Sequence, residues 1–364
     1  MSGNTARFFP ASYDDGRRNF REAARTAGAR LEEHINPNAR GPAGERLATD
    51  VARIGAEDAS KVLIINSATH GVEGFCGSGI QNGLLRTYGF SSLPADIAVV
   101  FVHAINPYGF AHVRRVTEEN VDLNRNFVDH DAGHPGNPAY DEIHALLVPA
   151  DYGPAKEAAD AAMMRYVAER GLKTLQAAVT GGQYDHADGL FYGGRAPTWS
   201  NRMWRTILDR HARGVRSAAF IDVHTGLGPY GYGEPIYSGV PGDATHDRAL
   251  AWYGKDVTAT EDGSSTSARV GGHLGLALKG VVSDGAAVAI ALEYGTRPVM
   301  DVLEALRADN WLYLHGDVNS ELGRAIKAQI RDALYPDEPR WKTMVFARAL
   351  DFMGRAISGM QALG

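Results

Sequence analysis

Residues 61–74 read KVLIINSATHGVEG. The apolar run at 61–65 has the length and branched composition of a buried strand. The glycine-flanked loop after it carries His70 and Glu73, three positions apart, so both side chains can reach one point. Neutral imidazole and carboxylate are good zinc ligands. Because the spacing is H-x-x-E and not the helix-borne H-E-x-x-H, Glu73 is predicted to be a ligand, and a catalytic base must come from elsewhere. So short a motif also arises by chance, and the metal site needs support from the rest of the chain.

Composition excludes several classes of protein. The chain has 364 residues, of which 44% are hydrophobic and 22% charged, as in ordinary globular proteins. A net charge of -6 offers no basic surface for nucleic acid or an anionic membrane. Cys76 is the only cysteine, so no intrachain disulfide can form. No stretch is long and apolar enough to span a bilayer. We expect a soluble, cytoplasmic protein.

Periodicity in the first third alternates between strands and helices, which is the pattern of an α/β sheet. An amphipathic helix is predicted over residues 12–35, ended by Asn36-Pro37-Asn38. Residues 48–56 and 61–65 are predicted to be paired strands joined by a turn at 57–60. Further elements are predicted as a strand at 97–102 and helices at 77–88, 157–178, 198–213, 302–314, 321–334 and 340–363.

A polar cluster follows the predicted strand at 97–102. Loops at the carboxyl edge of an open α/β sheet are where ligands bind. Arg114, Arg115 and Arg125 bring three guanidiniums into this region, and Asn124 lies next to Arg125. The planar guanidinium suits a carboxylate or a developing oxyanion. Paired arginines more often form a solvated surface, but Asn124-Arg125 is set among apolar neighbours and needs partners.

Two later predicted strands also end in residues that could bind a metal or transfer a proton. The run at 218–223 ends at His224, which would add a second imidazole to the His70 and Glu73 pair. Three protein ligands with an open position are typical of a catalytic zinc site. The run at 288–292 ends at Glu293, and a partly buried Glu beside a metal-bound water is a good general base. Taken singly, His224 could be a strand-edge histidine and Glu293 a salt-bridged carboxylate.

A glycine motif in the same region predicts no nucleotide site. Residues 226–231 match G-x-G-x-x-G. In dinucleotide-binding proteins this motif opens a helix. Here Pro229 and Pro235, together with more glycines, prevent one. We interpret the segment as a glycine-rich loop beside a site.

Together these patterns resemble the zinc metallocarboxypeptidase superfamily, the carboxypeptidase A-like fold, and most specifically its uncharacterised bacterial branch described as a domain of unknown function. The match covers roughly residues 60–300. It includes the His-x-x-Glu pair, the turn Asn106-Pro107-x-Gly109-Phe110, the pair Asn124-Arg125, the later His224 and the strand-end Glu293. The resemblance implies an α/β fold with a mixed, mostly parallel twisted sheet flanked by helices.

The resemblance also implies roles for individual residues. One zinc ion per chain would be held by His70, Glu73 and His224. Glu293 would be the catalytic base, and Arg115, or alternatively Arg114, would polarise the scissile carbonyl. Asn124, Arg125 and Arg114 would bind the substrate, and Asp122 would orient a zinc-bound histidine. The expected reaction is hydrolysis of an amide or peptide bond next to a free carboxylate.

One departure leaves the substrate open. Digestive members of the superfamily carry a Tyr shortly before the catalytic Glu, but residues 266–282 contain none. The substrate is therefore either a small carboxylate-bearing peptide or an N-acyl amino acid, as for aspartoacylase-like deacylases. In the second case residues 128–154, rich in His, Pro and Gly, are the candidate segment for covering the site. A non-catalytic zinc-binding or ligand-binding protein is the alternative from another class.

Domain organisation is predicted to be simple. No internal repeat and no linker divides the chain, so residues 1–364 are expected to form one catalytic domain, with 320–364 as a helical C-terminal extension. Apolar residues of the tail recur at roughly helical spacing. Such a stripe indicates a core or subunit contact, so a homo-oligomer also stays open.

Overall fold

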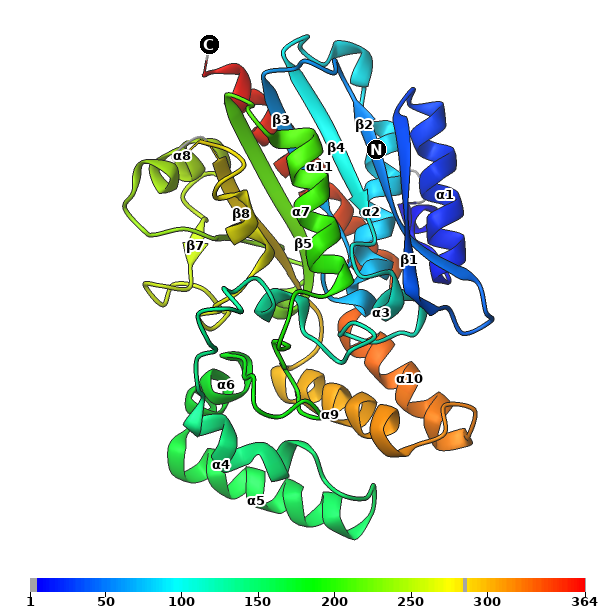
Figure 1. The fold of residues 1–364 in the computed structure, drawn as a ribbon, viewed down its shortest axis with the longest axis vertical. Coiled ribbons are helices and arrows are strands. Elements are labelled where there is room, and N and C mark those ends of the chain that lie inside the picture. The colour runs from blue at the N-terminus through cyan, green and yellow to red at the C-terminus, as the bar shows by residue number, and fades with distance from the viewer. Residues whose placement is uncertain (1–4, 284–286, 364) are drawn as a thin grey trace.

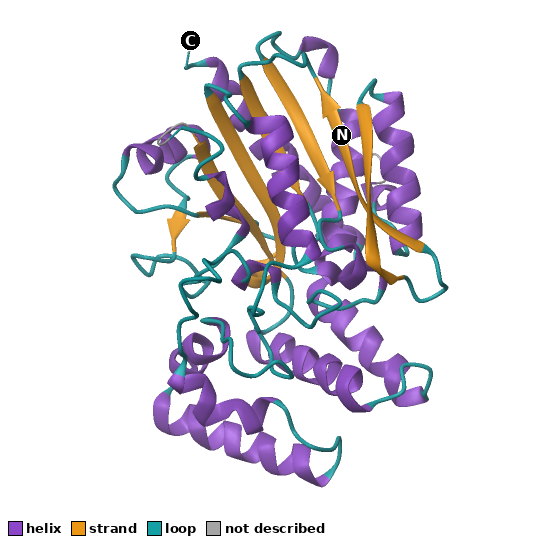
Figure 2. Cartoon of the chain, in the orientation of Figure 1, coloured by secondary structure: helices purple, strands orange, loops and turns teal. Residues whose placement is uncertain are grey.

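The computed structural model describes residues 5–283 and 287–363 and is built on one eight-stranded sheet (Figures 1 and 2). The strand order is β1-β2-β4-β3-β5-β8-β6-β7. The strands are β1 (Arg30–Arg40), β2 (Arg46–Ile54), β3 (Lys61–Asn66), β4 (Ile97–His103), β5 (Ser217–Tyr230), β6 (Glu234–Tyr237), β7 (Thr258–Ala259) and β8 (Ala287–Gly295). The four central strands β4, β3, β5 and β8 run parallel, while β1, β2 and β6 add antiparallel pairs. This confirms the predicted mixed, mostly parallel α/β fold.

Helices bury both faces of the sheet, which explains why the central strands are apolar throughout. Along β3, Leu63 and Ile65 point into one core, whereas Val62 and Ile64 point into the other. The first core is covered by α1 (Tyr13–Thr26), α2 (Gly74–Thr87) and α11 (Pro339–Gln361). The second is covered by α7 (Trp199–Ala212) and the short turn η5 (Leu274–Leu278).

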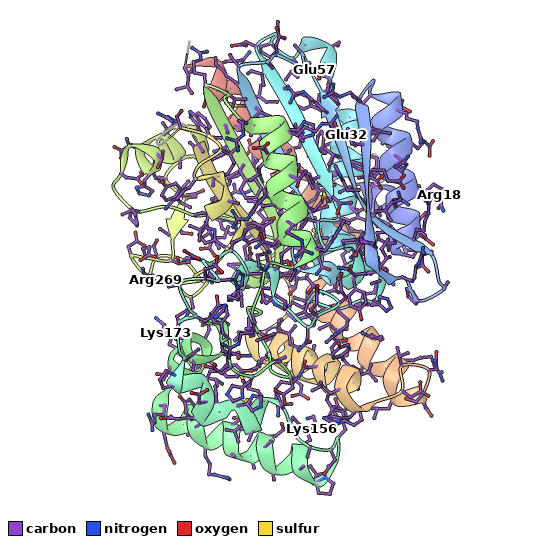
Figure 3. The ribbon with its side chains drawn as sticks, viewed as in Figure 1. Arg18, Glu32, Glu57, Lys156, Lys173 and Arg269 are labelled. Carbon is purple, nitrogen blue, oxygen red and sulfur yellow. The ribbon has the colours of Figure 1, made fainter. Side chains whose placement is uncertain are left out.

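A layer of helices lies beyond the carboxyl ends of the central strands, in the lower half of Figure 1. It comprises α4 (Pro138–Leu147), α5 (Pro154–Arg170), α6 (Leu172–Thr180), α9 (Val299–His315) and α10 (Glu321–Leu334). Lys156 of α5, labelled in Figure 3, pairs with Asp160 and with Glu304 of α9, at 2.7 Å each. This layer faces the sheet edge at which the predicted site residues lie. The remaining short elements are η1 (Thr5–Phe8), η2 (Gly71–Glu73), η3 (Phe90–Ser92), α3 (Pro107–Ala111), η4 (Leu123–Arg125) and α8 (Ala244–Tyr253).

Two predictions near the N-terminus are wrong. The first helix ends at Thr26, not near residue 35, because Gly28 adopts φ +74° and turns the chain into β1. The predicted stop at Asn36-Pro37-Asn38 lies inside β1, where the strand register shifts. The predicted pairing of 48–56 with 61–65 is also wrong, because β4 lies between β2 and β3.

Most other predicted elements are confirmed, with one correction. The helices predicted over 77–88, 198–213, 302–314, 321–334 and 340–363 correspond to α2, α7, α9, α10 and α11. The helix predicted over 157–178 is two helices, α5 and α6, because Gly171 at φ +86° breaks it. Residues 226–230 continue β5, and the segment 226–231 opens no helix, as expected.

The C-terminal helix α11 packs into the main core of the molecule. Trp341, Phe352 and Met360 of α11 are fully buried in the same core as Phe8 and Phe20 near the N-terminus. Gly364, the last residue of the predicted extension, lies outside the described residues. Within the described part of the chain, no helix combines the length and apolarity needed to cross a membrane.

Candidate metal centre

The predicted site residues meet at the carboxyl edge of the central strands. β3, β5 and β8 are neighbours in the sheet, and His224 of β5 stands directly opposite Glu293 of β8. In the loop that follows β3, His70 immediately precedes η2 and Glu73 is its last residue. A cavity of about 220 Å³ opens here and is lined by all four residues.

Tight turns at the strand ends shape this edge. Both β3 and β4 are followed by an alanine in the left-handed region, Ala68 at φ 60° and Ala104 at φ 62°. Non-glycine residues in this region are uncommon and are retained where the surrounding structure demands them. Gly71 packs so closely on Gly109 that an added Cβ would lie 2.0 Å from the Gly109 carbonyl carbon. Glycine at position 71 therefore allows the loop that carries His70 and Glu73 to pack against α3.

The three predicted ligands converge through specific atoms. His70 Nδ1 lies 2.8 Å from Glu73 Oε1, and His224 Nδ1 lies 3.0 Å from Glu73 Oε2. All three residues are buried, and their potential ligand atoms lie within 4.8 Å of one another. Burial raises the pKa of Glu73, but the two imidazoles outweigh burial and hold the pKa below its ordinary value. The carboxylate is therefore ionised, as a metal ligand must be.

A carboxylate also stands behind each imidazole. His70 Nε2 lies 3.3 Å from Asp122 Oδ1, and His224 Nε2 lies 2.8 Å from Asp222 Oδ2. Such carboxylate–histidine pairs fix the ring orientation and tautomer of metal ligands. Asp122 was predicted for this role, whereas Asp222 was missed. Its signal was the spacing Asp-x-His, because residues two apart on a strand share one face.

This donor set fits zinc. Two imidazole nitrogens and one carboxylate are the protein ligands of many catalytic zinc sites, which keep a further position open. The inward Nδ1 atoms of His70 and His224 face Glu73, and their outward Nε2 atoms face carboxylates, so neither ring is free to present its other nitrogen.

Glu293 is held beside the ligands but separate from them. Its Oε1 accepts a hydrogen bond from the backbone N–H of Leu227 at 3.0 Å. Burial, followed by repulsion from Glu73, raises the pKa of Glu293 from 4.5 to about 7. A carboxylate poised near neutral pH can take up and return a proton.

The two adjacent arginines have different surroundings. Arg115 lines the cavity, with Nη2 2.8 Å from His70 Nε2 and Nε 3.0 Å from Asp122 Oδ2. Arg114 points away from that cavity into a buried pair with Asp309 at 3.0 Å, and its guanidinium lies 3.8 Å from the centre of the Tyr313 ring. The predicted substrate contact of Arg114 is therefore not supported.

Asn124 and Arg125 both line the cavity, but protein groups already occupy them. Asn124 Nδ2 lies 3.2 Å from His224 Nε2, and its Oδ1 accepts the Leu274 N–H at 3.0 Å. Arg125 Nε and Nη2 both donate to the Thr180 carbonyl, and Nη1 lies 3.3 Å from the Asn124 carbonyl and 3.5 Å from Asp122. Burial raises the pKa of Asp122, but Arg115 and Arg125 outweigh burial and hold that pKa well below its ordinary value.

Two tyrosines near the site, Tyr237 and Tyr184, are candidates to replace the missing family Tyr, but both hydroxyls are already hydrogen-bonded. Tyr237 lines the cavity, but its hydroxyl donates to Asp243 at 2.9 Å and also contacts Thr245. The Tyr184 hydroxyl donates to the Arg125 carbonyl at 2.6 Å.

Several cavity residues were not predicted from the sequence. The guanidiniums of Arg115 and Arg125 both lie over the ring of Phe191. The backbone of Phe191 adopts the left-handed φ of 53°. Leu172, Leu175 and Val179 of α6 form an apolar wall, and His273 contributes a further imidazole. Residues 128–154, predicted to cover the site, do not line the cavity. Only tertiary packing places α6 there, so no local pattern could have indicated it.

Known proteins similar to this chain share little of its sequence. No curated protein matches the sequence. Similar solved structures include carboxypeptidase A from Helicoverpa armigera, with 16% identity, a TM-score of 0.45 and coverage of 90% of this chain and 75% of that chain. Succinylglutamate desuccinylase from Chromobacterium violaceum has 13% identity, a TM-score of 0.39 and coverage of 87% and 73%. Murein-tripeptide amidase from Escherichia coli O157 has 13% identity, a TM-score of 0.36 and coverage of 82% and 91%.

The family itself is identified by sequence. Residues 9–348 match the model of the family described as "Protein of unknown function (DUF2817)". The matched range contains every predicted site residue and all eight strands of the sheet. As the resemblance to an uncharacterised branch predicted, the chain belongs to the DUF2817 family.

Proposed function

We propose that this protein is a zinc-dependent hydrolase that cleaves an amide or peptide bond next to a free carboxylate. The observation that carries the proposal is the convergence of His70, Glu73 and His224, with Glu293 standing opposite His224 on the adjoining strand. Three buried donors with oriented rings fit a metal, and a neighbouring carboxylate with a pKa near neutrality fits a base.

Each group of the site has a separate role in the proposed hydrolysis. When bound by His70, Glu73 and His224, zinc supplies Lewis acidity to a carbonyl oxygen and to water. Glu293 takes a proton from the attacking water and returns it to the leaving amine. Arg115 donates to oxygen as negative charge develops on the carbonyl, and such a donor is typically worth about 3 kcal/mol.

The free carboxylate is the finer part of the proposal. Arg125 lines the cavity and, after its bonds to Thr180, Asn124 and Asp122, keeps one N–H of its five for a ligand. That N–H and the Arg115 guanidinium are the cationic donors lining the cavity that could meet a carboxylate.

The size of the cavity favours a second candidate, an N-acyl amino acid or small-amide deacylase. The cavity volume of about 220 Å³ suits a small molecule better than a polypeptide. The wall formed by α6 and by Met300 and Leu303 of α9 would accept an apolar acyl group.

The test combines metal content with activity. Wild type purified without added metal should contain about one zinc per chain, and His70→Ala should lose it. The zinc-loaded protein is then assayed against C-terminally unblocked dipeptides and against N-acyl amino acids. Glu293→Gln should retain zinc and lose activity, whereas the matched control Glu261→Gln, at another carboxylate of the cavity wall, should keep both. If no zinc binds even when it is supplied, the hydrolase proposal fails. If zinc binds and Glu293→Gln changes nothing, a non-catalytic binding protein is favoured instead.

A further inference from the structure

His273 is an imidazole of the cavity wall to which the proposed reaction assigns no role. It lies in the segment between β7 and η5, and its side chain is only partly buried. Asp222, Arg125 and Lys279, followed by His224, are the charged groups that most influence its pKa. His273 therefore belongs to the chemical neighbourhood of the metal centre without being one of its ligands.

The backbone around His273 is fixed on both sides. Gly272 accepts the Phe127 N–H at 3.0 Å, and the Leu274 N–H donates to Asn124 Oδ1 at 3.0 Å. The Leu274 carbonyl in turn accepts the indole N–H of Trp204 at 3.2 Å. Gly272 also has φ +80° and packs against the Arg125 backbone, where an added Cβ would lie 2.7 Å from the carbonyl oxygen. A ring carried on such a well-anchored segment is held in place in the cavity.

The ring nitrogens themselves have no hydrogen-bond partner among the described residues. In this they differ from three other polar groups of the cavity wall. Asn124 is bonded to His224 and Leu274, Arg125 to the Thr180 carbonyl, and the Tyr237 hydroxyl to Asp243. The structure thus anchors His273 tightly by its backbone while leaving its side chain available.

The chemistry of the ring suits an oxygen ligand. Burial lowers the pKa of His273 to about 4, so the imidazole is neutral at physiological pH. A neutral imidazole has one N–H donor and one acceptor nitrogen. It can therefore bind a carboxylate or carbonyl oxygen without adding a positive charge beside the metal ligands.

We propose that His273 is a substrate-binding residue whose ring N–H donates a hydrogen bond to a carboxylate or carbonyl oxygen of the substrate. The inference rests on the proposed hydrolase function and deepens it, because it names a polar contact that the occupied Asn124 and Arg125 side chains supply only in part.

The test separates binding from structure with three variants. His273→Phe keeps a ring but removes both nitrogens, and is expected to raise KM about 10- to 100-fold, with zinc content unchanged and a smaller effect on kcat. His273→Asn places an amide near Nδ1 and His273→Gln places one near Nε2, so recovery in one of them identifies the nitrogen used. His315→Phe, at an exposed histidine of α9, is the matched control and should behave as wild type.

The outcomes distinguish this inference from the proposed function. If wild type hydrolyses its substrate with zinc and His273→Phe stays within about twofold of it in KM and kcat, only the role of His273 is overturned. If Glu293→Gln is as active as wild type, the hydrolase function fails first. Should the Phe variant misfold, imidazole ¹⁵N NMR of Glu293→Gln titrated with N-benzoylglycine decides, because shifted His273 signals support the contact and unchanged signals overturn it.

Discussion

At the scale of single residues, we expect the carboxylate behind each of the two imidazoles to set the affinity of the proposed metal site. Asp222 accepts from Asn66 and Thr69 at 2.9 and 2.8 Å through one oxygen and faces His224 with the other. Replacing it by Asn would offer the ring a donor where it needs an acceptor. We expect Asp222→Asn to lower zinc affinity about 10- to 100-fold, measured by competition with a chelator of known affinity. Asp58→Asn, at an exposed carboxylate, is the control. Equal affinities for the two variants would show that Asp222 does not support the site.

The buried position of Glu293 is expected to lower the free energy of unfolding when its carboxyl group is ionised. Its pKa of about 7 in the folded protein exceeds the ordinary 4.5, so the folded state holds the proton more tightly than the unfolded state. The free energy of unfolding contributed by this group therefore falls as pH rises from about 4.5 to about 7, and the penalty is complete above that range. In metal-free protein at about pH 8, Glu293→Gln should raise the free energy of unfolding by up to about 3 kcal/mol.

Urea unfolding of both proteins at several pH values measures this effect. The difference between them should shrink below pH 7 and vanish near the ordinary pKa of 4.5. A difference that stays constant with pH would instead point to altered packing around the new amide.

At single residues, the sequence was most informative where a strand ended. The convergence of His70, Glu73, His224 and Glu293 could be predicted because each follows an apolar run, and the carboxyl ends of parallel strands meet at the edge of the sheet where ligands bind. The choice between Arg114 and Arg115 could not be made, because neighbouring residues in a loop point in directions that only tertiary packing decides. The position of His273 could not be predicted, because it lies in a glycine-rich segment without hydrophobic periodicity.

Gly71 shows how the arrangement of short elements controls the ligands. It joins η2 to α3 at backbone contact, and its N–H donates to the Arg115 carbonyl at 3.0 Å, beside the Val72 to Arg114 bond of 2.8 Å. A side chain at position 71 must push these segments apart, at a cost of about 1–3 kcal/mol. We expect Gly71→Ala to lower the melting temperature and to reduce zinc content.

Gly136→Ala provides the matched comparison, because an added Cβ there meets no atom within 4 Å. Melting temperature and zinc per chain are measured for both variants. If Gly71→Ala binds zinc as tightly as Gly136→Ala does, close packing of η2 on α3 is not what positions His70 and Glu73.

Whole elements were predicted well where their periodicity was long and poorly where a glycine or a distant strand decided the outcome. The end of α1 was misplaced because the predicted helix ran through Gly28, whereas the left-handed conformation of Gly28 ends it. The pairing of β2 with β3 was wrong because adjacency in sequence does not reveal that β4 inserts between them. Gly171 divided α5 from α6 for the same reason as Gly28.

Across the whole molecule, the two ends of the chain share one core. Phe8 packs on Phe346 with ring centroids 5.2 Å apart, and Phe352 stacks on Tyr253 at 5.2 Å. The Trp341 indole N–H donates to the Gly295 carbonyl at 2.9 Å, at the end of the strand that carries Glu293. These contacts make α11 a structural support of the site rather than an appendage.

We therefore predict that the chain folds as one unit that requires α11. Deleting residues 339–364 should remove cooperative unfolding, measured by circular dichroism, and abolish zinc binding, because it exposes the apolar surface of both α2 and α8. Phe352→Ala, which retains the helix, should cost about 3–5 kcal/mol by leaving a cavity. A chain ending at Gln361 is the control and should match wild type, because Ala362 and Leu363, which it lacks, are exposed. If the shortened chain still unfolds cooperatively and binds zinc, α11 is an extension that the fold does not require. The sheet and the remaining helices would then be sufficient to position the strands that carry the proposed ligands.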